Sequence, residues 1–200
     1  MRRLTFLFAA GVVAAALFTA ALTALTQPGK GEREPDVIYV PTPNEVVDKM
    51  LEMADVRPGE VVYDLGCGDA RIPIAASRKF GVKSWGFDIN PARVRESLEN
   101  VEKNNVQKLV TIELKDIFEL DLSKADVITL YLLPRLNVKL IPQLDKLKPG
   151  CRIVSHDFDM DGVRPKREFS MRPSNPADSG REHRVYLWMT PLEKVKTGVN

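Results

Sequence analysis

A short run of acidic residues and glycines is the part of this sequence best suited to bind a ligand. Residues 64–71 read Asp-Leu-Gly-Cys-Gly-Asp-Ala-Arg and follow the apolar residues 61–63. Because Gly66 and Gly68 have no side chain, the backbone can turn sharply and a ligand can approach it closely. Unpaired N–H groups at the start of the next helix favour a carboxylate or a phosphate. The run therefore predicts a strand, a ligand-binding turn and a helix.

The glycine spacing distinguishes between two nucleotide ligands. Dinucleotide-binding turns have the pattern Gly-x-Gly-x-x-Gly, but the position of the third glycine is Arg71 here. Asp64, at the end of the strand, would repel a pyrophosphate and accept hydrogen bonds from an amine. S-adenosylmethionine has a carboxylate, an ammonium group and a ribose diol. We therefore expect it, rather than NAD, to bind this turn.

Two further acids follow the next two predicted strands. Asp88 ends the strand-like run 82–88, where an acid is placed to bind both ribose hydroxyls. Asp116, followed by Ile117, comes after the predicted strand 109–114 and can accept a hydrogen bond from an adenine amino group. A single acid at a strand end often only caps a loop. Three acids after three successive strands favour a cofactor site.

A sheet must hold these acids, and strand patterns continue along the chain. Residues 126–132 are apolar on both faces, which is typical of a parallel strand, and residues 151–158 predict a fifth strand. Residues 162–182 predict a strand and an irregular loop before a last strand at 184–189. The pattern predicts an α/β fold with a doubly wound, mostly parallel seven-stranded sheet and an antiparallel last strand.

Three predicted helices, one before the first strand and two between strands, have recognisable ends or buried faces. Residues 42–45 have the spacing of a capping box, which predicts a helix to about Ala54 over the cofactor pocket. Asn90 and Pro91 would cap and start another helix. Its buried face would consist of Val94, Leu98 and Val101. The helix after residues 126–132 would kink at Pro142 and bury Leu136, Leu140, Leu144 and Leu147.

From about Tyr39 to Thr190 the chain resembles the class I, or seven-strand, S-adenosylmethionine-dependent methyltransferases. The resemblance implies cofactor contacts from the glycine turn, the ribose acid, the adenine segment and an upstream tyrosine: Asp64, Gly66, Gly68, Asp88, Asp116, Ile117 and Tyr39. Ala70 departs from that family's first motif, which often has a third glycine there. Because alanine is small and favours helices, we expect the position to tolerate it.

Three segments narrow the resemblance to one subgroup. Residues 39–43, 68–72 and 130–134 are similar to bacterial relatives of certain mitochondrial lysine methyltransferases. Those enzymes modify the c-subunit of ATP synthase and the adenine nucleotide translocase. The resemblance implies a protein substrate with a lysine amine as the methyl acceptor.

The acceptor site is expected after the strand 126–132. In the resembled enzymes that act on nitrogen, this segment lines the methyl group, and nucleobase methyltransferases often have an Asp or Asn there. Residues 131–134 read Tyr-Leu-Leu-Pro, which argues against nucleobase methylation. We expect Tyr131 to position an amine, Pro134 to line the site and the leucines to form an apolar slot that lowers a lysine's pKa. Ordinary core packing is the alternative for Tyr131 and the leucines.

Histidine and cysteine offer few other sites. His156 and Asp157 lie at the carboxyl end of a central strand, so His156 is a candidate catalytic-site residue, and a structural hydrogen bond is the alternative. His183 is predicted at the surface. Two histidines are too few for a zinc site without cysteine ligands, so no metal is expected. Cys67 and Cys151 predict no disulfide.

The first 26 residues differ from the rest in composition. Residues 4–26 carry no charge and are long enough to cross ~30 Å of hydrocarbon as a helix. They predict an uncleaved N-terminal membrane helix. A cleaved signal peptide, which also has a basic start, is the alternative. The predicted organisation is an anchor, a linker, a methyltransferase domain and a tail at residues 1–26, 27–38, 39–192 and 193–200.

Charge adds two expectations. Of the 29 basic residues, only Arg2 and Arg3 precede position 27, so residues 27–200 have 27 basic and 27 acidic side chains. This balance gives no support for a nucleic-acid partner, which would need a basic excess. The basic residues that flank the apolar run do not decide its orientation. Since S-adenosylmethionine is made inside cells, we expect the domain on the cytoplasmic face.

These features predict a membrane-anchored, S-adenosylmethionine-dependent methyltransferase whose acceptor is a lysine amine of a membrane-associated protein. Methylation of a small or lipid-soluble molecule at the bilayer is one alternative, but it would need an enclosed pocket built from inserted helices. A cofactor-binding membrane partner without activity is another. It would predict a damaged glycine turn, and residues 64–71 show no such damage.

Overall fold

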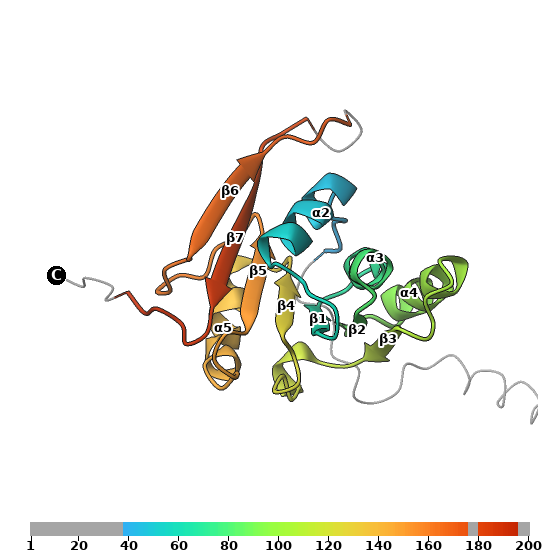
Figure 1. The fold of residues 1–200 in the computed structure, drawn as a ribbon, viewed down its shortest axis with the longest axis horizontal. Coiled ribbons are helices and arrows are strands. Elements are labelled where there is room, and N and C mark those ends of the chain that lie inside the picture. The colour runs from blue at the N-terminus through green and yellow to red at the C-terminus, as the bar shows by residue number, and fades with distance from the viewer. Residues whose placement is uncertain (1–37, 176–179, 196–200) are drawn as a thin grey trace, which may run out of the picture. The chain divides into compact units, whose positions relative to one another are not determined.

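The computed structural model describes residues 38–175 and 180–195, which form a seven-stranded sheet with helices on both faces (Figure 1). The strands are β1 (Val61–Leu65), β2 (Lys83–Asp88), β3 (Val110–Leu114), β4 (Val127–Leu130), β5 (Arg152–His156), β6 (Arg167–Met171) and β7 (His183–Met189). Their order in the sheet is β3-β2-β1-β4-β5-β7-β6. Strands β1 to β5 are parallel, and β7 is antiparallel to both of its neighbours. The predicted mostly parallel α/β sheet with an antiparallel last strand is confirmed.

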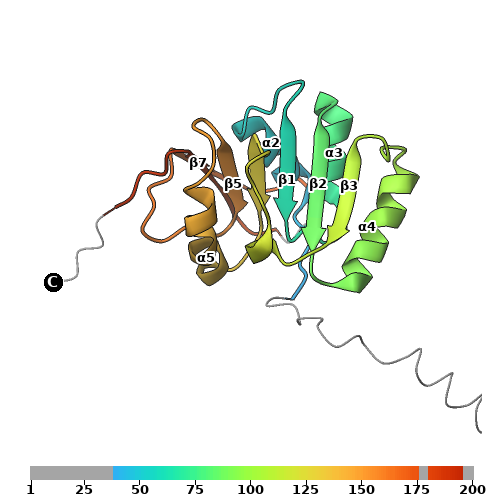
Figure 2. The same ribbon diagram turned by 90° about the horizontal axis from the view of Figure 1, so that it is seen from below.

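Helices cover the two faces of the sheet unequally. Figure 1 shows one group of helices on one face of the sheet and α5 (Pro134–Leu144) on the other, and Figure 2 gives a second view. The group consists of α2 (Asn44–Met53), α3 (Arg71–Phe80) and α4 (Pro91–Lys103). Alternate strand residues point to opposite faces. Accordingly, Val62 packs with the α2 residues while Tyr63 and Leu65 pack with those of α5.

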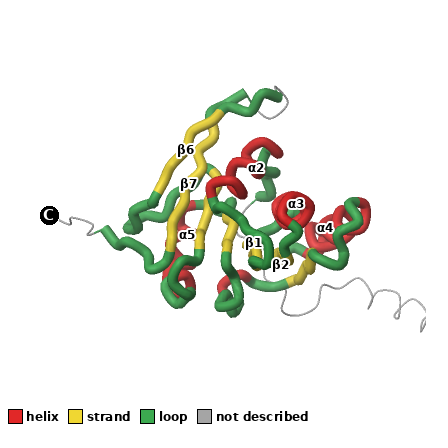
Figure 3. Tube along the Cα trace, in the orientation of Figure 1, coloured by secondary structure: helices red, strands yellow, loops and turns green. Residues whose placement is uncertain are grey.

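Two predicted strands end earlier than expected, and both ends lie at the site described below. Strand β4 stops at Leu130, and residues 131–133 lie outside the sheet before α5 begins at Pro134. Strand β5 stops at His156 because Asp157 has a φ of +60°, in the left-handed region that an extended strand cannot accommodate. The expected strand and last strand are present as β6 and β7, and the described residues between them, 172–175 and 180–182, belong to no helix or strand (Figure 3).

The predicted capping box before α2 is wrong. The helix begins at Asn44, and its N-cap, Pro43, makes no side-chain capping hydrogen bond. The side chains of Thr42 and Glu45, which would have formed the capping box, contact residues far along the chain instead. Thr42 Oγ1 lies 3.1 Å from His156 Nδ1, and the Glu45 carboxylate accepts hydrogen bonds from Ser174.

The buried face of α4 differs from the predicted one. Leu98 is 50% exposed, while Ser97 and Val101 are buried. Ser97 Oγ donates a hydrogen bond to the carbonyl of Gly68 at 2.7 Å. The helix therefore turns a polar residue toward the glycine turn and leaves Leu98 near solvent. The predicted cap at Asn90 is confirmed, since its side chain accepts a hydrogen bond from Ala92 N.

The leucines predicted to be buried in and just after α5 are buried: Leu136, Leu140, Leu144 and Leu147. Pro142 lies inside this helix, and the kink expected there stays a prediction. Cys67 and Cys151 are both free thiols and buried. No helix in the described part of the chain is both long and apolar enough to cross a bilayer. The predicted membrane helix at residues 4–26 lies outside the described residues.

Candidate cofactor and acceptor site

Three residues of the glycine turn after β1 have a left-handed backbone conformation. Gly66, Gly68 and Ala70 have φ values of +85°, +57° and +65°. The N–H groups of Gly66 and Cys67 both donate to the Phe87 carbonyl, at 2.8 and 3.0 Å, which fixes the turn to β2. Glycine adopts such φ values without strain, whereas alanine pays about 1–2 kcal/mol. Because Ala70 is the left-handed N-cap of α3, its helix propensity does not explain why alanine is present there.

Tyr39 covers this turn from a distant part of the chain. A Cβ atom at Gly68 would lie 2.7 Å from Tyr39 Cδ2 and closer still to Cε2, so the ring needs a glycine beneath it. The Arg93 guanidinium lies 4.9 Å from the ring centroid. Burial and the nearby Asp69 carboxylate raise the pKa of Tyr39 to about 12. Tyr39, predicted as a cofactor contact, therefore lies at the predicted turn.

Asp88 connects the turn to the start of α4. Its Oδ2 accepts a hydrogen bond from Gly68 N at 3.0 Å, and its Oδ1 accepts one from Asn90 N at 2.8 Å. Burial raises the pKa of the carboxyl group. A carboxylate oxygen can accept more than one hydrogen bond. Asp88 is therefore oriented by the backbone and keeps acceptor capacity for a ribose diol; the ribose contact itself stays a prediction.

Asp64 lies deeper than the sequence suggests. Its side chain is 3% exposed, and its Oδ1 accepts a 2.6 Å hydrogen bond from Thr129 Oγ1 on β4. Burial raises its pKa to about 7, although the Thr129 hydroxyl acts in the opposite direction. The contact of Asp64 with an amine stays a prediction. Its visible role is to link β1 to β4 beneath the turn.

Asp116 and Ile117 lie next to Asp88 at the end of β3. Lys115 N donates to the Asp88 carbonyl at 2.9 Å, which brings the two strand ends together. Asp116 Oδ1 caps a short 3-10 helix, Ile117–Glu119, by accepting from Phe118 N at 2.9 Å. Ile117 is half-buried against the core on the α5 face. The three predicted acids thus gather at one edge of the sheet.

S-adenosylmethionine fits this edge. Because Gly66 and Gly68 have no Cβ, Leu132 and Tyr39 pack closely on the turn, and α3 begins directly after it, where the N–H groups of a helix start favour a carboxylate. The acids would accept hydrogen bonds from its amine, ribose and adenine. The methyl group that the cofactor supplies is bonded to a positively charged sulfur.

The segment after β4 lies against the same turn. A Cβ at Gly66 would lie 3.0 Å from Leu132 Cδ2, so Leu132 packs over the turn. Leu132 is buried but Leu133 and Pro134 are exposed, so only one of the two leucines is withdrawn from solvent. Pro134 is the first residue of α5, and its proposed place in the acceptor site stays a prediction.

Tyr131 is half-buried beside Leu132 and packs against two aromatic rings. Its ring centroid lies 4.0 Å from that of His156 and 6.0 Å from that of Phe158. Its hydroxyl donates to Asp157 Oδ2 at 3.4 Å. Burial raises the pKa of the phenol, so Tyr131 is neutral and can donate a hydrogen bond.

His156 lies beneath Tyr131 and is fully buried. Its Nδ1 faces the Thr42 hydroxyl, and its Nε2 lies 2.8 Å from His183 Nδ1. Burial lowers the pKa of His156 to about 4, so the ring is neutral. These contacts favour the structural alternative, in which His156 makes hydrogen bonds within the fold. The prediction that His183 lies at the surface is wrong, since it is 2% exposed at the start of β7 beside β5.

His156, Asp157 and His183 together form a possible metal-ligand set. One ligand atom from each lies within 4.8 Å of the others. The sequence predicts no metal because two histidines are too few for a zinc site, but Asp157 adds a third possible ligand here. However, Asp157 Oδ2 is already paired with the Arg181 guanidinium, which would repel a cation. We therefore interpret the group as a hydrogen-bonded cluster. Sequence reasoning missed Arg181, which no motif marks.

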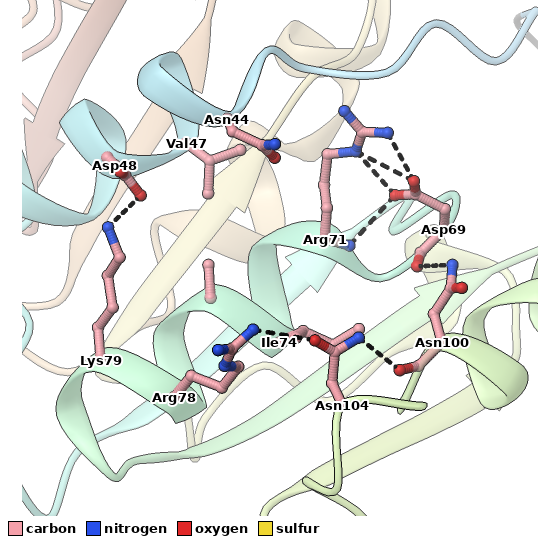
Figure 4. Close-up of a pocket in the computed structure, with 11 residues that line it drawn as sticks. Asn44, Val47, Asp48, Asp69, Arg71, Ile74, Arg78, Lys79, Asn100 and Asn104 are labelled. Atoms are coloured by element: carbon pink, nitrogen blue, oxygen red, sulfur yellow. Dashed lines mark hydrogen bonds and ion pairs between the residues drawn. The ribbon is translucent and has the colours of Figure 1, made fainter. Parts of the chain in front are cut away.

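A separate cavity of about 570 Å³ lies among α2, α3 and α4 (Figure 4). It touches the turn only at Asp69 and Arg71. Its charged groups are paired with neighbours: Arg71 with Asp69, Lys79 with Asp48, and Arg78 with Asn104. The cavity is thus separate from the edge where the three acids gather.

Comparison with known proteins identifies the family. A family described as the ANTKMT methyltransferase domain matches residues 64–167. A protein-lysine N-methyltransferase of Saccharolobus islandicus (strain REY15A) is 46% identical over 157 residues, which cover 78% of this chain and 94% of that protein. The lysine N-methyltransferase of the ATP synthase c-subunit from Homo sapiens is 26% identical over 121 residues, 60% of this chain and 51% of that protein.

A solved structure gives the same indication of the cofactor. An RNA methyltransferase from Salinibacter ruber, in complex with S-adenosyl-L-homocysteine, has a TM-score of 0.69 and 42% identity. The match covers 80% of this chain and 99% of that one. S-adenosyl-L-homocysteine is what remains of S-adenosylmethionine after methyl transfer. The chain belongs to the ANTKMT methyltransferase family and is an S-adenosylmethionine-dependent methyltransferase.

Proposed function

We propose that this enzyme methylates the side-chain amine of a lysine in a protein. The observation that carries the proposal is the 46% identity to a protein-lysine N-methyltransferase along 94% of that protein's length. The geometry agrees with an amine acceptor. Tyr131 and Asp157 offer a hydroxyl and a carboxylate beside the turn, where a nitrogen can be held by hydrogen bonds.

The reaction is a displacement in which the nitrogen–carbon bond forms as the carbon–sulfur bond breaks. The protein must align a neutral amine with the methyl group and limit water. Leu132, buried over Gly66, supplies an apolar wall that favours the neutral form of the amine. Positive charge moves from sulfur to nitrogen during transfer, so a carboxylate near the nitrogen stabilises the transition state. We assign this role to Asp157, whose carboxylate accepts a hydrogen bond from Tyr131.

The finer proposal is that the acceptor belongs to a membrane-associated protein. The 23 uncharged residues at positions 4–26 support a membrane helix that would keep the domain at a bilayer. The catalytic domain would face the cytoplasm, where its cofactor is made. A reporter fused after Asn200 tests this orientation. Reporter activity on the outer side of the membrane would refute it.

RNA methylation is a second candidate, because the structurally similar protein from Salinibacter ruber is described as an RNA methyltransferase. Two features of this chain favour the protein substrate. Residues 27–200 carry equal numbers of basic and acidic side chains, and residues 131–134 contain no Asp or Asn. Lysine and arginine side chains supply the affinity for phosphate backbones, and residues 27–200 have no excess of them over acidic side chains.

One labelling experiment separates these substrates. The full-length protein in detergent is incubated with methyl-labelled S-adenosylmethionine and, separately, with membrane proteins, soluble proteins and total RNA. Mass spectrometry then locates the label. We expect methyl-lysine in the membrane-protein fraction and no labelled RNA. Label in RNA, or only in small molecules, would contradict the proposal. Asp88→Ala serves as a control that should abolish labelling in every fraction.

A further inference from the structure

A cation already occupies the acceptor side of the site. The Arg181 guanidinium pairs with Asp157 Oδ2 and donates a hydrogen bond to the Tyr131 hydroxyl at 3.5 Å. Arg181 comes from the loop before β7, and its side chain is 47% exposed. Its charged end is therefore held by the site while the rest of the side chain remains near solvent.

The carboxylate that holds this cation is itself fixed by the backbone. Asp157 N donates to the Arg184 carbonyl at 2.7 Å, and Asp157 Oδ1 accepts from Arg184 N at 3.1 Å. These bonds hold Asp157 in its left-handed conformation, with a φ of +60°. Such conformations cost free energy and persist where the surroundings impose them. As a result Oδ2 is directed to Tyr131 and Arg181.

A series of contacts connects Asp157 Oδ2 to the cofactor turn through Tyr131 and Leu132. Tyr131 adjoins Leu132, which packs over Gly66 in the cofactor turn. The rings of His156 and Phe158 support Tyr131 from the side of β5. A lysine nitrogen held by Asp157 and Tyr131 would thus reach the cofactor turn beside Leu132.

We propose that Asp157 Oδ2 and the Tyr131 hydroxyl form the subsite for the substrate's lysine nitrogen, and that Arg181 fills this subsite until a substrate displaces it. The inference rests on the proposed lysine acceptor and deepens it. A lysine ammonium and a guanidinium are both cationic donors, so one can replace the other on a carboxylate and a phenol oxygen. The bound ammonium must first lose a proton to water. The same carboxylate then stabilises the charge that the neutral nitrogen gains as its bond to the methyl carbon forms and the carbon–sulfur bond breaks.

The test uses butylammonium, a minimal lysine side chain, with full-length protein saturated with S-adenosylhomocysteine. Binding is measured by calorimetry or by ligand-observed NMR. Arg181→Ala should bind butylammonium roughly threefold or more tightly than the unaltered protein, because the competing cation is gone. Asp157→Asn should bind it roughly 10- to 100-fold more weakly, because a hydrogen bond to a charged group is lost. Asparagine tolerates the left-handed conformation, so the fold should persist.

Controls make the result specific. Arg172→Ala removes an exposed arginine that directly follows β6 and should bind like the unaltered protein. Butanol has the same carbon chain length but no charge, and we expect no measurable binding of butanol to any of these proteins. The subsite is refuted if Arg181→Ala binds butylammonium no more tightly, or if Asp157→Asn binds it equally well. If these results appear as expected but labelling yields no methyl-lysine, the lysine acceptor is wrong and the cation subsite stands.

Discussion

Replacing Gly68 by alanine tests the structure of the cofactor turn. The substitution has two separable costs. A left-handed alanine at a φ of +57° loses about 1–2 kcal/mol. The new Cβ would also lie 2.7 Å from Tyr39 Cδ2, so the Tyr39 ring must leave the turn. We therefore expect a loss of stability of about 1–2 kcal/mol from the backbone strain. In addition, we expect weaker cofactor binding because Tyr39 is displaced.

Gly81→Ala is the matched control for the first cost. Gly81 has a similar φ of +67°, but a Cβ there meets no atom within 4 Å. Thermal unfolding should show similar strain in both variants. Calorimetric titration with S-adenosylhomocysteine should show weaker binding only for Gly68→Ala. If Gly68→Ala binds with unchanged affinity, Tyr39 and the turn do not form the cofactor site as described.

Three further substitutions test the acids and the tyrosine. Asp88→Ala should weaken S-adenosylmethionine binding by about 3–6 kcal/mol in calorimetry, since two charge-assisted hydrogen bonds of about 1.5–3 kcal/mol each are lost; normal affinity would refute the ribose contact. Tyr131→Phe should lower turnover with nearly unchanged cofactor affinity, and parallel loss of both would instead make Tyr131 part of the cofactor pocket. Asp64 should make the cofactor-free protein less stable as pH rises from about 4 to about 7, because its pKa is raised to about 7 and the folded state holds the extra proton below that pH. Denaturation of Asp64→Asn should show a smaller decline over this range, and an identical decline would contradict the raised pKa.

The cofactor side of the site could be predicted because its signals are local in sequence. Residues 64–71 contain the glycines that form the turn, and Asp88 is the last residue of the strand that positions it. Parallel strands bring their carboxyl ends to one edge, so local signals become neighbours in space. The exception is Asp64. Its spacing predicted an acid at the turn, but its burial depends on Thr129, which lies 65 positions away.

The acceptor side could not be predicted because distant pairings form it. Antiparallel pairing of β5 with β7 brings His183 to His156, 27 positions apart, and buries a histidine that looks polar in sequence. Arg181 reaches Asp157 through the same pairing. Thr42 illustrates the same limit. Thr42 matches the sequence pattern of a capping box, but in the structure its hydroxyl faces His156, which lies 114 positions away.

A crystal structure of the full-length protein with S-adenosylhomocysteine and a lysine-containing peptide tests the central claim most directly. We predict the ribose hydroxyls on Asp88, the adenine beside Ile117, and the cofactor sulfur directed toward Tyr131. The lysine nitrogen should lie on Asp157 with Arg181 displaced. A cofactor bound elsewhere, such as in the cavity among α2, α3 and α4, or a peptide lysine remote from Tyr131, would contradict the account.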